Sequence, residues 1–280
     1  MKQCIICGQS DYKTVFKEFE IDILKCRNCG HIFSSYEADQ NYSGYFEKEI
    51  EENDHFWWNE AHNRMYDDFC DKFIIGKSGK LLDVGCGLGY FVKKISVLPN
   101  WEVFGYEISE PAVNYAKNNL GLKNIFYGRV EDSDFPAKHF DIITLWDVIE
   151  HIPDPKPLLV YLKTILKDDG ILFIHTPNVK IQLIKAKAKK IIKGMKEREH
   201  YMEAKDHINI YSPRAIKKIL NQVGFKKIKF IHLHPIQSVS GSKSVFRMFL
   251  KNSWFNMAIF IYFITCGKIN LDNLFVAAGK

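Results

Sequence analysis

From residue 80 onward, short apolar segments alternate with longer amphipathic segments, and this alternation constrains the fold more than any other feature of the sequence. Amphipathic segments such as SEPAVNYAKNNL and SPRAIKKILNQVGF have helical periodicity, with Ser109 and Ser212 as suitable N-caps. The short segments resemble buried strands: KLLDV, WEVFGYE, NIFYG, FDIITLW, ILFIHT, KKIKFIHL and DNLFVAAGK. The pattern predicts an α/β fold with a doubly wound, mostly parallel, seven-stranded sheet and helices on both of its faces.

The first of these strands ends in a glycine-rich loop, within LLDVGCGLGYF. In an open α/β sheet a ligand binds where the first strand gives way to its helix, and Gly85, Gly87 and Gly89 let the backbone approach it there. The dinucleotide fingerprint GxGxxG has a final glycine where this chain has Tyr90. Asp83, just before the loop, would repel a pyrophosphate and favour a cation. A nicotinamide-dinucleotide-binding oxidoreductase is therefore kept only as an alternative.

A second carboxylate, Glu107, ends the next predicted strand. A carboxylate at this place can accept hydrogen bonds from two ribose hydroxyls. Together with Asp83 it indicates a nucleoside that has a positive charge and no phosphates, a description that S-adenosylmethionine fits. Both acids could instead be caps at the ends of their strands.

At this point the sequence resembles the class I S-adenosylmethionine-dependent methyltransferases, which have a Rossmann-like sheet of the kind predicted above. LLDVGCGLG at 81–89 is similar to their first motif, and VFGYEISEPAVNYAK at 103–117 to their second. FPAKHFDIITLWDVIEHIPDP at 135–155 and LKDDGILFIHTPN at 166–178 resemble the segments that follow. Four ordered motifs are more specific than one glycine loop.

The resemblance implies roles for the matching residues. Asp83 and Gly85 would flank the methionine moiety, and Glu107 would hold the ribose. Arg64, in the first predicted helix of this part, could meet the methionine carboxylate. The other expected cofactor contacts are Cys86 and Gly87 in the loop, Ile108 on the adenine face, Glu131 or Asp132 near the adenine amino group, Asp147 at the mouth of the site and Tyr45 in the preceding linker. Asp147 could alternatively be a helix cap.

Two histidines are candidate catalytic bases, because transfer of a methyl group to a hydroxyl also requires removal of its proton. His151 lies in the HIPDP turn, and His207 lies in the segment DHINIYSP. Each has a structural alternative: His151 could hydrogen-bond its own turn, and His207 could be a loop histidine with its hydrogen bonds satisfied.

Four of the seven cysteines form two CxxC pairs, Cys4 with Cys7 and Cys26 with Cys29. This spacing is typical of a tetrahedral zinc site, in which four thiolates leave no open position for water. It predicts a structural Zn²⁺ in a zinc ribbon over residues 1–40, with His31 as a bystander. Four reduced thiols or a redox pair are the alternatives. A ribbon in a nucleic-acid-binding protein is a further alternative, although its basic residues are only scattered.

A lysine-rich helix is expected at 181–196, within an insertion at about 180–205 of a methyltransferase domain that spans 41–280. Its apolar face would consist of Ile181, Ile184, Ala188, Ile191 and Met195. The helix is expected either to pack on the sheet edge or to contact an anionic membrane. The apolar stretch at 254–266 is too short to span a bilayer and is expected to be a buried helix.

These observations predict a cytoplasmic S-adenosylmethionine-dependent methyltransferase that contains Zn²⁺, with peripheral contact to a membrane as a further expectation. Its expected partner is a small-molecule acceptor, a sugar or a lipid-linked saccharide ahead of a quinone-like ring. The net charge of +6, from 39 basic and 33 acidic residues, is too small to argue for nucleic acid as a partner. No secretory signal is visible in the first 20 residues.

Overall fold

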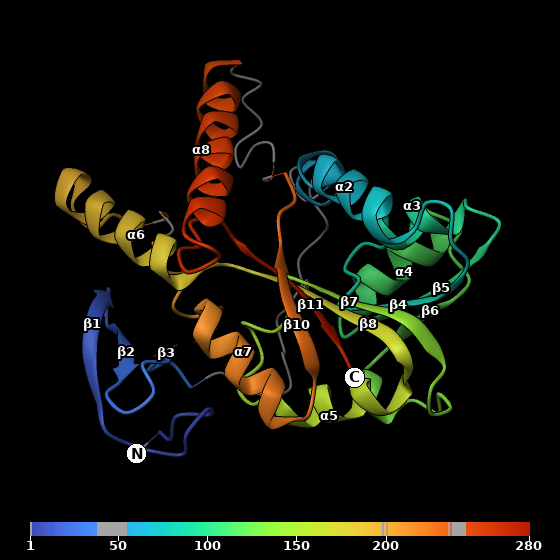
Figure 1. The fold of residues 1–280 in the computed structure, drawn as a ribbon, viewed down its shortest axis with the longest axis horizontal. Coiled ribbons are helices and arrows are strands. Elements are labelled where there is room, and N and C mark those ends of the chain that lie inside the picture. Colours follow the sequence, from blue (N-terminus) through green and yellow to red (C-terminus); the bar gives the residue numbers. More distant parts are fainter. Residues whose placement is uncertain (1, 38–54, 198, 200, 235, 237–244) are drawn as a thin grey trace.

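A computed structural model describes residues 2–37, 55–197, 199, 201–234, 236 and 245–280. Its centre is a seven-stranded sheet with the strand order β10-β11-β8-β7-β4-β5-β6 (Figure 1). The pairs along β8-β7-β4-β5-β6 are parallel, whereas β11 is antiparallel to both β8 and β10. The strands are β4 (Gly79–Val84), β5 (Trp101–Glu107), β6 (Ile125–Tyr127), β7 (Phe140–Trp146), β8 (Leu166–Thr176), β10 (Lys226–Ile231) and β11 (Leu274–Gly279). The predicted fold class is confirmed.

Successive residues of a strand point to opposite faces of the sheet, so the apolar strands make both faces apolar. Helices cover both of these faces. Leu82 belongs to the core on one face, under α5 (Lys156–Ile165) and α7 (Pro213–Gln222). Its neighbour Leu81 belongs to the core on the other face, under α2 (Asn63–Phe73), α3 (Tyr90–Ser96) and α4 (Glu110–Asn118). Two single-turn elements complete this part, the π-helical η1 (Phe56–Ala61) and the 3-10 turn η2 (Val130–Asp132). As predicted, Ser109 and Ser212 cap α4 and α7.

The N-terminal segment forms a separate four-stranded antiparallel sheet with the order β1-β2-β3-β9. β1 (Tyr12–Glu18), β2 (Ile21–Cys26) and β3 (Ile32–Ser34) come from the first part of the chain. The fourth strand, β9 (Asn209–Ile210), comes from the segment between β8 and α7. The cysteine-bearing sheet therefore includes two residues from the segment that carries His207. The expected boundary near residue 40 lies outside the described residues.

The basic helix α6 (Val179–Lys193) packs on the N-terminal sheet, but not through the predicted face. It buries Val179 and Ala186, while Ile184 and Ile191 are 66% and 84% exposed. Phe16 of β1 and Met202 of the following loop belong to the same apolar cluster as Ala186. The short side chain of Ala186 permits a close approach to this sheet, so the more bulky isoleucines point to solvent.

The expectation of a buried C-terminal helix is wrong. α8 (Val245–Ile264) projects from the body of the molecule (Figure 1), and of its described residues it buries only Phe255 and Ala258. An apolar sequence favours burial of a helix but does not determine that the same chain buries it. In the described part of the structure the body contacts α8 on the side of Phe255 and Ala258. Among the described residues, no helix has the length and apolar content required to cross a membrane.

Candidate functional site

The glycine loop bends sharply at the carboxyl end of β4. Gly85, Gly87 and Gly89 all have positive φ, at 72°, 52° and 82°, a region that other residues rarely adopt. A Cβ on Gly85 would lie 2.5 Å from Cγ2 of Val148, whereas one on Gly87 would meet no atom of the described residues within 4 Å. Gly85 therefore allows the glycine loop to approach Val148 closely, and Gly87 faces a space that the described part of the chain leaves open.

That space is a cleft at the carboxyl ends of β4, β5 and β7. Its volume, including the open mouth, is about 840 Å³. Several residues expected to contact the cofactor or acceptor line it, namely Gly85, Gly87, Glu107, Ile108, Glu131, Asp147 and His151. Asp83, Cys86, Asp132, Arg64 and His207 are not among the lining residues. Tyr45 lies outside the described residues.

Glu107 lies at the centre of this arrangement. The N–H of Gly87 donates to its Oε2 at 2.8 Å, and the N–H of Ser109 donates to its Oε1 at 2.9 Å. Burial raises the pKa of the Glu107 carboxyl, while these backbone donors oppose the rise. Each oxygen has a further lone pair, so the fixed carboxylate can accept two more hydrogen bonds on the side of the cleft.

Asp83 lies just beneath the lining of the cleft. Its Oδ1 accepts a 2.6 Å hydrogen bond from the Thr144 hydroxyl, and the residue is buried. Burial raises the pKa of the Asp83 carboxyl to about 8, Thr144 lowers it, and the nearby Glu107 raises it further. In the ligand-free cleft Asp83 is therefore mostly protonated at pH 7, and a cation bound next to it would favour its ionised form.

Asp147 is an ionised acid with an unusual backbone. Its φ is 52°, and its Oδ1 lies 3.1 Å from Nδ1 of His175. The side-chain amide of Asn273 donates to Nε2 of His175, which directs the Nδ1–H toward Asp147. Burial acts to raise the pKa of Asp147, but His175 and His62 hold it far below its usual range. The sequence pattern offers no signal for His175, which reads as part of a buried strand.

His151 and His207 lie together beside the cleft, with ring centroids 5.0 Å apart. Nδ1 of His151 donates to the carbonyl oxygen of Asp206 at 3.0 Å, so Nε2 is the basic nitrogen of the neutral ring. Burial and the neighbouring His207 lower the pKa of His151 to about 4. His207 accepts from Gln182 at Nδ1 and directs Nε2 toward Glu203 at 3.1 Å, so both of its nitrogens have protein partners.

Sequence reasoning missed Glu150, although it stands next to His151 in VIEHIPDP. The residue is buried, and among the described residues neither of its carboxyl oxygens has a hydrogen-bond partner of good geometry. Burial and the charge of Asp147 raise the pKa of Glu150 well above its usual range. Glu150, His151 and His207 can bring one ligand atom each within 4.8 Å of one another, a donor set that could also hold a divalent cation.

The expected adenine contacts and the first helix differ from expectation in detail. Glu131 lines the cleft together with Arg129, whose Nη2 lies 3.5 Å from Oε1 of Glu131, whereas Asp132 is not a lining residue. Arg64 instead donates to the side chain of Asn252 in α8 at 3.3 Å. Arg64 thus contacts the projecting helix in this structure rather than the cleft.

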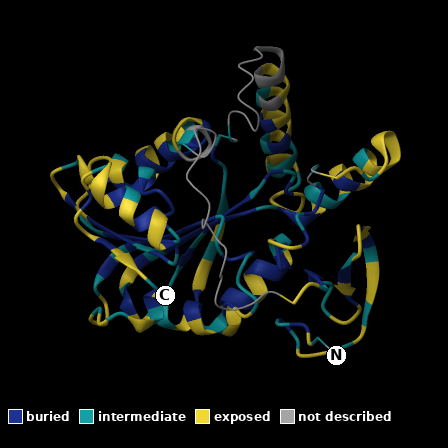
Figure 2. Cartoon of the chain, turned by 180° about the vertical axis from the view of Figure 1, so that it is seen from behind, coloured by how far each residue is buried: buried dark blue, intermediate teal, exposed yellow. Residues whose placement is uncertain are grey.

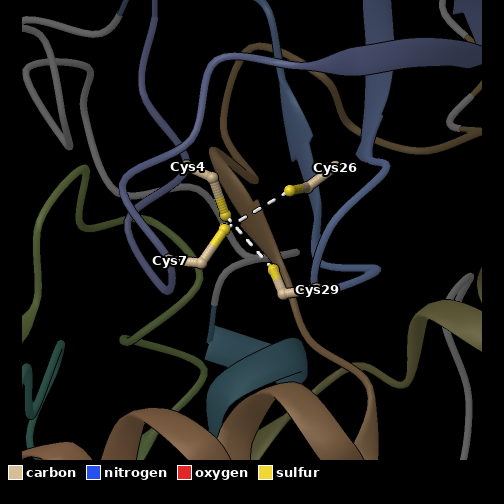
Figure 3. Close-up of side chains that lie close together, drawn as sticks. All are labelled: Cys4, Cys7, Cys26 and Cys29. Atoms are coloured by element: carbon tan, nitrogen blue, oxygen red, sulfur yellow. Dashed lines mark hydrogen bonds between the residues drawn. The ribbon is translucent and has the colours of Figure 1, made fainter.

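The four expected metal ligands converge at one end of the N-terminal sheet (Figure 3). Cys4 and Cys29 Sγ atoms are 3.5 Å apart, as are those of Cys7 and Cys26, and all four lie within 4.8 Å of one another. Tetrahedral Zn–S bonds of about 2.3 Å require sulfur separations of about 3.8 Å, so the four thiols fit a zinc ion. These separations are far longer than a disulfide bond.

Both CxxC pairs have the same local structure, which explains how they converge. The N–H of Gly8 donates to the carbonyl of Cys4, and the N–H of Gly30 donates to the carbonyl of Cys26. Both glycines have positive φ, at 72° and 77°. Each pair is thus a tight turn that points two thiols in one direction.

The N-terminal sheet also holds the loop that carries His207. Both carboxylate oxygens of Glu18 are used: Oε1 accepts from the N–H of Tyr201, and Oε2 accepts from those of Met202 and Ala204, at 3.0 to 3.2 Å. Ser34 adds a backbone hydrogen bond to the carbonyl of Ile208. The sheet therefore fixes the loop over 201–208 next to the cleft.

Comparison with known proteins is consistent with this geometry. A family model described as "Methyltransferase domain" matches residues 57–229. A ubiquinone biosynthesis O-methyltransferase of Glaesserella parasuis is 29% identical over 200 residues, which cover 66% of this chain and 76% of that protein. The enzyme of the same name from Thiobacillus denitrificans is 33% identical over 104 residues, or 35% of this chain and 44% of that protein.

A solved structure shares the fold at low sequence identity. It is phosphoethanolamine N-methyltransferase 2 of Haemonchus contortus, with phosphomonomethylethanolamine and S-adenosylhomocysteine bound. It superposes with a TM-score of 0.54 at 17% identity, covering 81% of this chain and 57% of that one.

Proposed function

The chain belongs to the S-adenosylmethionine-dependent methyltransferases, and we propose that it methylates a hydroxyl oxygen of a small acceptor in the cleft beside His151. The family match decides against the dinucleotide oxidoreductase as the explanation of the glycine loop. One observation carries the proposal: the Glu107 carboxylate, fixed by the amides of Gly87 and Ser109, faces a cleft at the carboxyl ends of the parallel strands.

The residues of the cleft fit the cofactor. Glu107 would accept the ribose hydroxyls, and Ile108 would contact the adenine ring. Gly85 and Gly87 would lie against the methionine part, while Asp147, held ionised by His175, would attract its ammonium group. Asp83 would support the positive charge from beneath the loop. When bound, S-adenosylmethionine supplies an electrophilic methyl group on a sulfonium sulfur.

His151 is the proposed base. The carbonyl of Asp206 fixes its Nδ1–H, so Nε2 is the nitrogen able to accept the acceptor's proton. Because its pKa is about 4, the ring is neutral at pH 7 and ready to accept a proton, although it is a weak base. His207 packs against this ring and positions it, which is a different role from the catalytic one expected from sequence.

The proposed acceptor is a sugar hydroxyl, either of a free sugar or of a lipid-linked saccharide. The basic helix α6 supports this proposal, because its lysines suit an anionic carrier or membrane. A second candidate is a ring hydroxyl of a quinone precursor, favoured by the names of the relatives that match this chain. A weak base favours the second candidate, because a phenolic proton is more acidic than a sugar proton.

The four cysteines are proposed to hold a structural Zn²⁺. A sheet as small as β1 to β3 buries little apolar surface, so the metal would stabilise it. Its functional contribution is then to keep the loop over 201–208 in place.

Calorimetry with S-adenosylmethionine and S-adenosylhomocysteine tests the central claim. Wild type should bind both, and Glu107→Ala should bind each at least about tenfold more weakly, because two ribose hydrogen bonds are lost. Glu102→Gln is the matched control, since Glu102 lies on the same strand at its other end and pairs with Lys80 on the surface. Equal affinity of Glu107→Ala and wild type would overturn the proposed cofactor position.

A further inference from the structure

Helix α8 presents a largely apolar surface to solvent. Its sequence, VFRMFLKNSWFNMAIFIYFI, has no acidic residue. Phe249, Phe260 and Phe263 are 64%, 64% and 68% exposed, and Met257 and Ile264 are exposed as well. At 3.6 residues per turn these five residues, here named the α8 stripe, lie on one side of the helix, opposite the buried Phe255 and Ala258.

The helix is nonetheless firmly attached at its base. The Phe255 ring packs on His234 with centroids 4.9 Å apart, and the Tyr262 ring packs on His232 at 4.5 Å. The indole N–H of Trp254 donates to the carbonyl oxygen of Leu271. α8 is therefore a fixed rod that projects from the body (Figure 1) and has many exposed residues (Figure 2). A group of exposed large apolar side chains such as the α8 stripe marks an interaction site.

The second projecting helix, α6, carries positive charge. Its fifteen residues contain six lysines and no acid. Ile191 and Ile192, near its free end, are 84% and 79% exposed. Both helices extend beyond the body of the molecule (Figure 1).

Charge decides which partner fits. A second copy of the chain would bring two lysine-rich helices together, which is unfavourable, whereas an anionic lipid surface neutralises them. Phenylalanine, tryptophan and isoleucine opposite a positively charged flank are typical of helices that lie in the membrane interface.

We propose that α8 inserts its stripe into the headgroup region of an anionic bilayer, with the α6 lysines against the lipid phosphates. α8 lies on the membrane and does not cross it. This docking is independent of the identity of the acceptor, and it would place the cleft next to lipid-borne molecules.

Flotation with vesicles tests the proposal. Wild type should bind vesicles of phosphatidylcholine mixed with phosphatidylglycerol and bind pure phosphatidylcholine much less. Phe260→Ser with Phe263→Ser should weaken binding to the mixed vesicles at least about tenfold, because two large apolar side chains no longer enter the interface. The matched control is Ile75→Ser with Val97→Ser, two exposed apolar side chains on the α2 and α3 side of the molecule, which should bind like wild type.

The electrostatic part has its own pair of variants. Lys185→Glu with Lys187→Glu on α6 should reduce binding to the mixed vesicles, and the wild-type interaction should weaken as salt is added. Lys217→Glu with Lys218→Glu on α7 changes the net charge equally and should have little effect. S-adenosylmethionine binding by every variant verifies that it is folded.

Three results would overturn the proposal. One is failure of wild type to float with anionic vesicles, and another is equal flotation of wild type and the Phe260/Phe263 variant. The third is a dimeric mass in light scattering that becomes monomeric in the same variant, since a second copy would then cover the stripe.

Discussion

The imidazole of His31 donates a 3.1 Å hydrogen bond from Nε2 to Oδ1 of Asn209. The amide of Asn209 in turn donates to the carbonyl oxygens of Ile152 and Pro153, directly after His151. Burial lowers the pKa of His31 to about 4, so it stays neutral and can keep this role at any physiological pH. A chain of polar contacts therefore leads from the turn of Cys29 to the turn of His151.

The first prediction follows from that connection. Cys26→Ser should abolish binding of the proposed zinc ion and lower the free energy of unfolding by at least about 2 kcal/mol, because the N-terminal sheet would lose its metal. Binding of S-adenosylmethionine should persist, since none of the described N-terminal residues lines the cleft, while acceptor turnover falls. Metal analysis, calorimetry and a turnover assay measure the three effects. Cys266→Ser, at the exposed cysteine, is the control, and normal turnover without zinc would contradict the scaffold role.

Glu18 should be essential for the position of the His207 loop. In Glu18→Gln one acceptor oxygen becomes an NH₂ group that faces backbone N–H donors, at a cost of about 1 to 3 kcal/mol. We expect faster amide exchange across 201–208 and a higher KM for the acceptor, with unchanged affinity for S-adenosylmethionine. Glu20→Gln, which alters an exposed ion pair with Lys17, should change neither quantity.

Asp83 should link pH to both stability and binding. Its folded-state pKa of about 8 lies above the unfolded value of about 4, so its contribution to stability is complete below pH 4 and is lost as the pH rises toward 8. The stability of Asp83→Asn relative to wild type should therefore increase across this window, by about 1.4 kcal/mol per unit of pKa shift. Denaturant titrations at several pH values measure it.

The same carboxyl should release a proton when the cationic cofactor binds at pH 7. Calorimetry in buffers of different ionisation enthalpy reports this release, and Asp83→Asn should abolish it. A buffer-independent binding enthalpy in wild type would show that cofactor binding does not change the protonation of Asp83 and would contradict this prediction.

His151→Gln should reduce kcat by about a hundredfold or more, because a general base commonly contributes that much. Affinity for S-adenosylmethionine should change little. In wild type, kcat should stay level at neutral pH and fall only as the pH drops toward 4, where His151 becomes protonated. His139→Gln, at the opposite end of β7, is the matched control. A variant that retains wild-type kcat would exclude His151 as the base.

Gly85→Ala should be far more damaging than Gly121→Ala. Both positions have positive φ, 72° and 69°, so both pay a backbone cost of about 1 kcal/mol or more. Only at Gly85 would the new Cβ meet Val148 at 2.5 Å; at Gly121 nothing lies within 4 Å. Thermal unfolding and cofactor titration should show an added loss in Gly85→Ala, partly restored by Val148→Ala. Equal effects of the two alanine variants would contradict the steric explanation.

Local patterns were sufficient to predict the central sheet. The alternation of strands and helices determines which residues reach each face, and hydroxyl caps such as Ser109 determine where helices begin. The spacing of Cys4, Cys7, Cys26 and Cys29 likewise predicts a cluster, because each pair forms its own turn. These features depend on neighbours in the sequence.

The features that escaped prediction depend on distant contacts. Glu18 lies more than 180 residues along the chain from the backbone N–H groups whose hydrogen bonds it accepts. No local sequence pattern identifies Glu18 as their acceptor. In the sequence His175 is indistinguishable from other residues of a buried strand, and only the fold brings it next to Asp147. The apolar stretch at 254–266 predicts a buried helix and most of it is exposed, because composition reports how apolar a helix is and not which surface covers it.

The short strand β9 also has a consequence for the order of events during synthesis. Until residues 209 and 210 leave the ribosome, β3 has an open edge that another chain could occupy. The two cysteine turns can close early, but the sheet they anchor is completed only after the central strands β4 to β8 have been made. Early metal capture would therefore protect the nascent N-terminus from mispairing during the longest part of translation.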